Sequence, residues 1–136
     1  MDVSIPNDAD TGQTNDNASL HGRTCLLVED EALVAGYLKA LLEDAGMIVI
    51  GPYGRLVDAV NAAHHADIEV AILDIAVHGG DVFPAADILV ARGVPIVFHT
   101  GHGERNTIVH AYPNAVIVHK PAAESELLQE LIAITS

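Results

Sequence analysis

Residues 70–75 read Val-Ala-Ile-Leu-Asp-Ile, an apolar run that carries one acid, Asp74, close to its end. A short continuous apolar run is typical of a strand that is buried on both faces of a parallel sheet. Comparable runs occur on both sides of it along the 136-residue chain. In sequence order, the five predicted strands are residues 25–28, 47–50, 70–75, 95–99 and 116–119.

Helical patterns of apolar residues separate these strands. The first pattern places six apolar side chains on one stripe: Leu33, Val34, Tyr37, Leu38, Leu41 and Leu42. Gly46 follows it in the position where glycine commonly ends a helix. The further patterns cover residues 56–63, 81–89, 104–111 and 127–132, and Asp81 is the predicted N-cap of the third helix. Five strand-and-helix units predict one α/β domain of three layers, in which helices cover both faces of a five-stranded parallel sheet.

The beginning of the chain differs in composition from the rest. Residues 1–22 are rich in acids and amides and hold few large apolar side chains. Such a segment cannot bury enough surface to offset the entropy lost on ordering. We therefore expect a disordered tail over residues 1–22 and a single domain over residues 23–136.

The charge balance is strongly acidic, with a net charge of −13 and only 6 Lys and Arg residues. Nucleic-acid binding needs clustered cations, so we do not expect it. The apolar runs are too short to cross a bilayer, and no signal-peptide pattern is present, so no membrane association is expected. A single cysteine, Cys25, fits a reducing compartment, and we expect a cytoplasmic protein.

Charged and polar side chains follow four of the predicted strands. Glu29 and Asp30 follow the first, Asp74 ends the third, Thr100 follows the fourth, and Lys120 with a proline follows the fifth. Functional sites of parallel sheets lie at the carboxyl ends of the strands, so these side chains are expected to converge. Carboxylates suit Mg²⁺, a carboxylate can attack phosphorus, and a lysine and a hydroxyl can stabilise phosphoryl oxygens. The set predicts phosphoryl transfer to Asp74.

Over residues 23–136 the chain resembles the receiver domain of two-component response regulators. In that family an acidic pair follows strand one and the acceptor Asp follows strand three. A Ser or Thr follows strand four, and Lys-Pro follows strand five. The resemblance implies a flavodoxin-like fold of strand order 2-1-3-4-5 and a cis bond between Lys120 and Pro121. It also implies that Asp30, Asp74 and the backbone carbonyl of Ala76 bind Mg²⁺ directly, while Glu29 acts through a metal-bound water.

Residues 95–102, which read PIVFHTGH, resemble the PFxFATGY signature of the FATGUY group of single-domain regulators. This resemblance implies general stress signalling. The phosphoryl donor is expected to be a sensor histidine kinase or a histidine phosphotransfer protein. Since no output domain is predicted, the chain is expected to signal by contact with a downstream protein or to act as a phosphate sink. It is not expected to be an enzyme that acts on other substrates.

The chain departs from the family at three positions. Ile117 stands three residues before the lysine, where an aromatic residue is usual, and His78 stands where a proline usually follows the acceptor. Glu29 replaces the more common Asp. Because Ile117 has no ring, we expect the switching movement to occur in the loop after Thr100 and in the helix over residues 104–111.

Other interpretations of these residues remain open at this level. Two different functions compete: a scaffold that binds partners without phosphorylation, and a hydrolase with an aspartyl nucleophile. Glu29 and Asp30 would also suit the N-terminus of the following helix. Four histidines are expected near the same edge and suggest a transition-metal site, although their spacing matches no zinc motif. These are His78, His99, His102 and His119.

Overall fold

The computed structural model describes residues 18–101 and 105–136. The strands of the main sheet are β1 (Thr24–Val28), β2 (Ile48–Tyr53), β3 (Val70–Leu73), β6 (Ile96–Thr100) and β7 (Val116–His119). The helices between and after them are α2 (Ala32–Asp44), α3 (Leu56–His65), α4 (Phe83–Ala91), α5 (Arg105–Ala111) and α6 (Glu124–Thr135). A short antiparallel pair, β4 (Ala76–Val77) and β5 (Gly80–Asp81), follows β3. No helix in the described part of the chain is long and apolar enough to cross a membrane.

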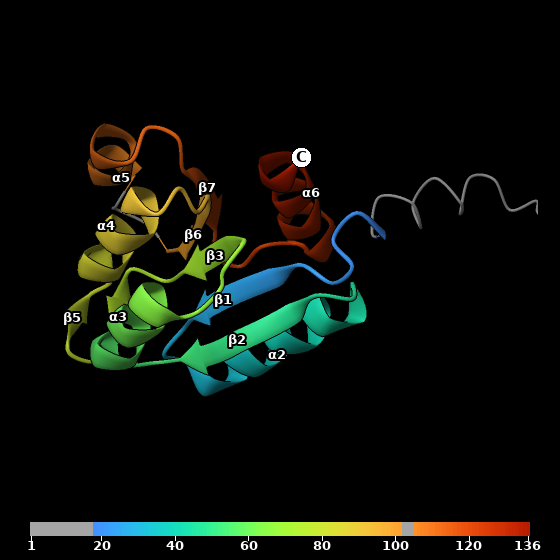
Figure 1. The fold of residues 1–136 in the computed structure, drawn as a ribbon, viewed down its shortest axis with the longest axis horizontal. Helices are drawn as coiled ribbons and strands as arrows, with labels where there is room; N and C mark the ends of the chain where they lie inside the picture. Colours follow the sequence, from blue (N-terminus) through green and yellow to red (C-terminus); the bar gives the residue numbers. More distant parts are fainter. Residues whose placement is uncertain (1–17, 102–104) are drawn as a thin grey trace, which may run out of the picture.

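The main sheet is parallel throughout and has the order β2-β1-β3-β6-β7. Counted along the chain, this is the predicted order 2-1-3-4-5, and the flavodoxin-like fold is confirmed. The central strand β3 is buried at all four of its residues, which explains its continuous apolar sequence. The carboxyl ends of β1, β3, β6 and β7 lie at the same edge of the sheet (Figure 1).

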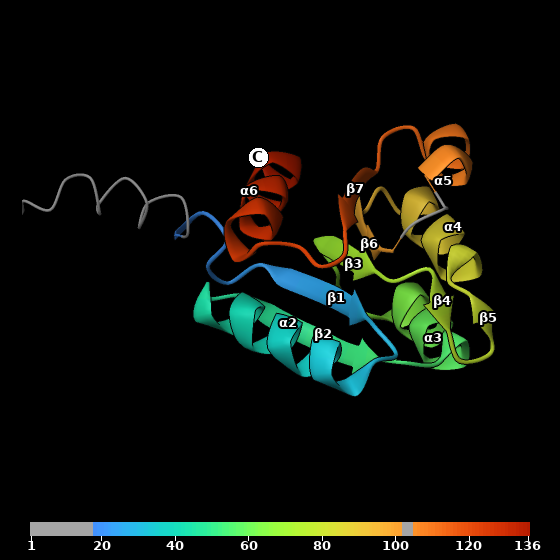
Figure 2. The same ribbon diagram turned by 180° about the vertical axis from the view of Figure 1, so that it is seen from behind.

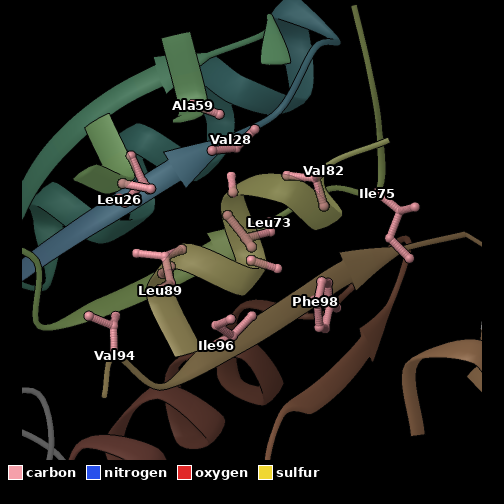
Figure 3. Packing of buried hydrophobic residues seen from close by; sticks show 14 of the residues in the cluster. Leu26, Val28, Ala59, Leu73, Ile75, Val82, Leu89, Val94, Ile96 and Phe98 are labelled. Atoms are coloured by element: carbon pink, nitrogen blue, oxygen red, sulfur yellow. The ribbon is translucent and has the colours of Figure 1, made fainter. Parts of the chain in front are cut away.

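Helices cover both faces of the sheet and give the domain three layers (Figures 1 and 2). The side chains of Leu26, Leu73 and Phe98 belong to the core beneath α3, α4 and α5, part of which is drawn in Figure 3. The neighbouring residues Leu27 and Ile72 belong to the opposite core, beneath α2 and α6. The alternation follows from the pleat, which sends successive side chains to opposite faces.

The apolar stripe predicted for α2 is wider than the face that the helix buries. Leu38 and Leu42 are buried, as expected. Leu33 is 89% exposed and Tyr37 is 47% exposed, so the prediction is wrong for these two side chains. The sheet covers only one arc of the helix, and residues outside that arc face solvent whatever their hydropathy.

β2 continues beyond its predicted end, through Gly51 and Pro52 to Tyr53. Within the described residues it is an edge strand that pairs with β1 alone, so a proline without an N–H group is tolerated there. The register slips by one residue at this point, because Leu26 pairs with Ile50 but Val28 pairs with Tyr53. Gly51 has φ +104, and a Cβ atom there would lie 2.7 Å from the carbonyl oxygen of Leu27. The bulge therefore requires glycine.

The segment after β3 differs from the prediction in detail. Asp81 lies in β5, and the residue at the N-cap of α4 is Val82. The Asp81 carboxylate nevertheless accepts a hydrogen bond from the Phe83 amide at 3.2 Å. Asp81 thus accepts a hydrogen bond from one of the free amides at the start of α4, as an N-cap side chain does. It does so from the position directly before the N-cap residue Val82.

Residues 18–22, at the end of the predicted tail, are described and belong to the domain. Leu20 is fully buried in the core beneath α2 and α6. Its carbonyl accepts a hydrogen bond from the Arg23 amide at 3.1 Å. The isolated leucine in a polar segment gave no periodic signal, which is why the predicted boundary lay at residue 23. Residues 1–17 lie outside the described part of the chain.

Candidate functional site

Three carboxylates meet where β1 and β3 end. Glu29 and Asp30 follow β1, and Asp74 follows the neighbouring strand β3. One oxygen from each of the three lies within 4.8 Å of the others. The Asp74 amide donates to the Val28 carbonyl at 2.9 Å, and the Glu29 amide donates to the Tyr53 carbonyl at 2.8 Å. Backbone hydrogen bonds between neighbouring strands therefore fix the positions of these acids.

Lys120, which follows β7, supplies the cation of this cluster. Its ammonium nitrogen Nζ lies 2.9 Å from Oε1 of Glu29 and 3.0 Å from Oδ2 of Asp74. The Lys120 amide donates to the Thr100 carbonyl at 2.8 Å, which aligns the ends of β6 and β7. Only 1% of the Glu29 side chain and 20% of the Lys120 side chain are exposed. Lys120 is thus held between two carboxylates, unlike a solvated surface lysine.

Burial and charge act in opposite directions on this cluster. Burial raises the pKa of Glu29 and the nearby Asp74 charge adds to the rise, while hydrogen bonds from Lys120 and the Glu31 amide oppose it. Burial alone would lower the pKa of Lys120, but its bonds to Glu29 and Asp74 outweigh that effect and raise the pKa. Lys120 therefore keeps its proton at neutral pH. A single ammonium group faces several carboxylates, which favours the binding of a further cation.

The donor set suits a hard divalent cation. Mg²⁺ binds oxygen ligands octahedrally at about 2.1 Å, which places neighbouring ligand oxygens roughly 3 Å apart. The oxygens of Glu29, Asp30 and Asp74, within 4.8 Å of one another, can meet this requirement with small adjustments. Ala76, whose carbonyl the resemblance assigns to the metal, lies two residues beyond Asp74 at the start of β4. The residues present therefore fit Mg²⁺.

Adding Mg²⁺ is expected to stabilise the fold. A ligand that binds only the native state raises the free energy of unfolding, and at ten times its Kd the gain is about 1.4 kcal/mol. For a domain of this size, such a gain raises Tm by roughly 5 °C. Thermal melts with millimolar MgCl₂ and with EDTA measure the shift. Asp30→Ala should remove most of it, whereas Asp67→Ala, at an exposed acid outside the cluster, should not.

The acidic pair does not serve simply as a helix cap. The N-cap residue of α2 is Glu31, and it makes no side-chain capping bond. Oε2 of Glu29 accepts a hydrogen bond from the Glu31 amide at 3.1 Å, while Oε1 faces Lys120. Glu29 therefore joins the start of α2 to the lysine, and Asp30 belongs to the carboxylate cluster.

The other predicted residues lie at or near this edge. Thr100 is the last residue of β6, 5% exposed, and pairs in register with His119. Ile117 is half-buried and pairs with Phe98. His78 lies in the turn between β4 and β5, where its amide donates to the Gly54 carbonyl at 2.9 Å.

The histidines do not form a metal site in the described part of the chain. Among the described residues, the acidic trio is the one cluster of at least three histidine, cysteine or acidic side chains that could hold a metal ion. None of the three described histidines of the predicted set, His78, His99 and His119, belongs to such a cluster. His102 lies outside the described residues. The site edge therefore offers carboxylate ligands for a hard cation.

The sequence analysis missed Glu31, which lies beside the cluster, and it expected His99 at this edge but did not predict its burial. Glu31 Oε1 lies 3.9 Å from the Lys120 ammonium, and its position directly after the acidic pair was the signal that could have indicated it. His99 is 4% exposed, and among the described residues neither ring nitrogen has a hydrogen-bond partner. His99 stands where the PFxFATGY signature has alanine, but its burial on the α2 side of the sheet left no pattern in the sequence.

Replacing His99 by leucine is expected to stabilise the protein, and more so in acid. Unpartnered buried nitrogens cost about 1–3 kcal/mol. Burial and the Lys120 charge lower the pKa of His99, although Asp74 opposes the shift. The unfolded chain therefore takes up a proton at His99 at a higher pH than the folded protein does. This lowers stability as pH falls below about 6.5, by up to about 1.4 kcal/mol per pH unit.

Urea unfolding of wild type and His99→Leu at pH 8 and pH 5.5 measures this effect. The difference in the free energy of unfolding between the two proteins should be larger at pH 5.5. His64→Gln, at an exposed position of α3, is the control and should show no such widening. A difference that stays constant with pH would contradict the titration of His99.

Comparisons with known proteins agree with this geometry. A family model described as the response regulator receiver domain matches residues 25–132. The transcriptional regulatory protein PdtaR of Mycobacterium tuberculosis, from two strains, is 28% identical over 121 residues, which are 87% of this chain. This chain covers 59% of the length of these curated relatives.

Two solved structures extend the likeness to three dimensions. The signal receiver domain of a modulated diguanylate cyclase from Desulfovibrio desulfuricans is 29% identical with a TM-score of 0.74, and the match covers 84% of this chain and 94% of that one. The receiver domain of sensor histidine kinase PA1611 from Pseudomonas aeruginosa is 27% identical with a TM-score of 0.71, over 82% and 98% of the two chains. That structure has a magnesium ion coordinated in its active site cleft.

Proposed function

Because this chain belongs to the family of response regulator receiver domains, we propose that it accepts a phosphoryl group on Asp74 from a histidine kinase or a histidine phosphotransfer protein. One observation carries the proposal. Asp74 lies within 3.0 Å of the Lys120 ammonium and shares a cluster of carboxylates with Glu29 and Asp30. This arrangement combines a nucleophile, a fixed cation and a set of metal ligands at the carboxyl edge of the sheet.

In the proposed transfer, a carboxylate oxygen of Asp74 attacks phosphorus while the bond from phosphorus to the donor histidine nitrogen breaks. The nitrogen keeps the electron pair of that bond, and the product is an aspartyl phosphate. Negative charge is spread over the equatorial phosphoryl oxygens in the transition state. Lys120 is placed to stabilise one of these oxygens. The Thr100 hydroxyl, at the end of β6, would donate a hydrogen bond to another.

Asp30, Asp74 and the Ala76 carbonyl would hold Mg²⁺ directly, and Glu29 would contact it through a water molecule. When bound, the ion neutralises phosphoryl charge. The trio provides carboxylate oxygens within 4.8 Å of one another, which supports this assignment. The contact between Glu29 and Lys120, at 2.9 Å, also keeps the buried carboxylate charge balanced.

We further propose that the phosphorylated form signals in the cytoplasm by contact with a downstream protein, or drains phosphoryl groups as a sink. The net charge of −13 favours partners with basic surfaces. The PFxFATGY-like stretch at residues 95–102 supports a role in general stress signalling. We propose no catalytic action on other substrates, since the protein would modify only itself and slowly lose the phosphoryl group.

Incubation with a small phosphoryl donor such as acetyl phosphate, in the presence of MgCl₂, tests the proposal. Intact-protein mass spectrometry should show one added phosphoryl group per chain. A phosphorylation-independent scaffold would gain no mass. A hydrolase with an aspartyl nucleophile would instead release phosphate from many equivalents of donor without a stable adduct. Either of these two results would overturn the proposal.

A further inference from the structure

The helix that follows the site is attached to the domain by few side chains. α5 (Arg105–Ala111) comes after Thr100 and lies at the margin of the molecule beside α4 (Figures 1 and 2). Between residues 106 and 111, Ile108 is the one buried residue, and the others are exposed. Tyr112, which directly follows the helix, is buried at 8% exposure. The position of α5 therefore depends mainly on Ile108 and Tyr112.

Tyr112 joins three elements through its ring. It stacks on Phe83, the first residue of α4, at a centroid distance of 5.6 Å and an interplanar angle of 18°. It also contacts Phe98 of β6 at 5.3 Å. Phe98 and Phe83 meet edge to face at 6.2 Å. These three rings form one cluster, which we call the aromatic triad, and it links α4, β6 and the end of α5.

A short hydrogen bond fastens the same tyrosine to α4. The Tyr112 hydroxyl donates to Oδ1 of Asp87 at 2.6 Å. Hydrogen bonds to an ionised acceptor are shorter and stronger than neutral ones. Burial, and then the bond to Asp87, raise the pKa of Tyr112, so the hydroxyl remains a donor throughout the physiological range.

The aromatic triad also reaches the phosphorylation site along β6. Phe98 and Thr100 are two residues apart in one strand, so their side chains point to the same face of the sheet. Ile117, which pairs with Phe98 in register, is aliphatic and stiff at χ1. Within the described residues, the ring contacts of Phe98 are with Phe83 and Tyr112. A shift of the Thr100 end of β6 would therefore move the Phe98 ring and disturb its contact with the Tyr112 ring.

We propose that the hydrogen bond between Tyr112 and Asp87 is a latch that holds α5 against α4 in the unphosphorylated protein, and that phosphorylation releases it through Thr100 and Phe98. The release step rests on the proposed function, because it starts from a phosphoryl group on Asp74. The latch itself is a property of the unphosphorylated protein. Tyr112 and Asp87 are thus positioning residues for the moving helix and do not touch the phosphoryl group.

Hydrogen exchange of the 136-residue chain without phosphoryl donor tests the latch. Tyr112→Phe removes the hydroxyl and keeps the ring, and Asp87→Ala removes the acceptor. Each variant should speed amide exchange in residues 105–112 about tenfold, while amides of α3 and α6 keep their rates. The double variant should exchange no faster than Tyr112→Phe alone, because that substitution already removes the bond to Asp87 and the longer one to the Phe83 carbonyl at 3.5 Å. Asp58→Ala, at an exposed acid of α3, is the matched control and should leave α5 unchanged.

The release is tested with beryllofluoride and Mg²⁺, a mimic of the phosphoryl group, by following amide chemical shifts. In wild type, shifts should reach Tyr112, Asp87 and α5, and in Tyr112→Phe the α5 shifts should shrink because the helix is already free. Unchanged exchange in the single variants, or additive effects in the double variant, would overturn the latch. Shifts around Asp74 that stop short of Tyr112 would overturn the release while the proposed function stands. No shifts anywhere would refute the proposed function and the release with it.

Discussion

Asp74→Asn is expected to lose phosphoryl acceptance completely. An amide oxygen is a far weaker nucleophile than a carboxylate, and the substitution also removes one ligand of the proposed Mg²⁺ site. Asp74 lies at the end of the central strand, 3.0 Å from the Lys120 ammonium, so the proposed nucleophile is beside the cation that would stabilise the transferred group. Intact-protein mass spectrometry after incubation with acetyl phosphate and MgCl₂ should show no added mass in the variant.

Two controls make this result specific. Asp67→Asn, at an exposed acid outside the cluster, should be phosphorylated like wild type. A thermal melt should show that Asp74→Asn remains folded, because asparagine has nearly the same shape as aspartate. If the variant still gained one phosphoryl group, the acceptor would be another residue, with Asp30 and Glu29 as the first candidates to test.

Lys120→Met is expected to weaken both phosphorylation and folding. Loss of one preorganised charge that faces a transition state costs about 10²–10³ in rate. The Glu29 side chain is only 1% exposed, and its ion pair with Lys120 spans 2.9 Å. Removal of one partner of a buried pair leaves an uncompensated charge, and the free energy of unfolding should fall by about 3 kcal/mol. Urea unfolding at neutral pH and single-turnover phosphorylation by acetyl phosphate measure the two effects.

A second substitution separates the two effects. In Glu29→Gln/Lys120→Met, the Glu29 charge is removed and the Asp74 carboxylate, whose side chain is 9% exposed, is the one partner of Lys120 in the buried pair that stays charged. Part of the lost stability should therefore return while the phosphorylation rate stays low. Lys39→Met is the matched control, since Lys39 pairs with Glu43 at 3.0 Å on the exposed face of α2. Such a surface pair contributes about 0.3–0.5 kcal/mol. Equal destabilisation by Lys39→Met and Lys120→Met would show that burial of Glu29 does not govern the stability of this cluster.

The sequence predicted the architecture because the relevant signals are local. Each strand of the main sheet is a short apolar run, and the helices between them repeat apolar residues at helical spacing. β7 (Val116–His119) was predicted with its observed bounds. β2 was predicted three residues too short at its end, because the bulge at Gly51 allows an edge strand to continue through a proline. Such a continuation depends on the partner strand and leaves no local pattern.

The chemical character of the candidate site was likewise present in the sequence. Acids, a threonine and a lysine follow successive strands, and the order of a parallel sheet brings those strand ends to one edge. The identity of Glu29, Asp30, Asp74, Thr100 and Lys120 as site candidates therefore followed from chain position. The sheet order itself came from the resemblance, and the structure confirmed it.

Only the tertiary structure decided which of these groups contact one another and which side chains face solvent. Lys120 meets Asp74 across a separation of 46 residues and holds Glu29 as well, while Leu33 and Tyr37 stay outside the core despite their hydropathy. His99 became a buried histidine whose ring nitrogens have no hydrogen-bond partner among the described residues, and Tyr112 found Asp87 25 residues away. Hydropathy periodicity depends on neighbours along the chain, whereas contact, burial and pKa depend on the elements that pack against a residue. The chain itself therefore specified the strands and the residue types at their ends, and packing determined the ion pairs, the buried histidine and the attachment of α5.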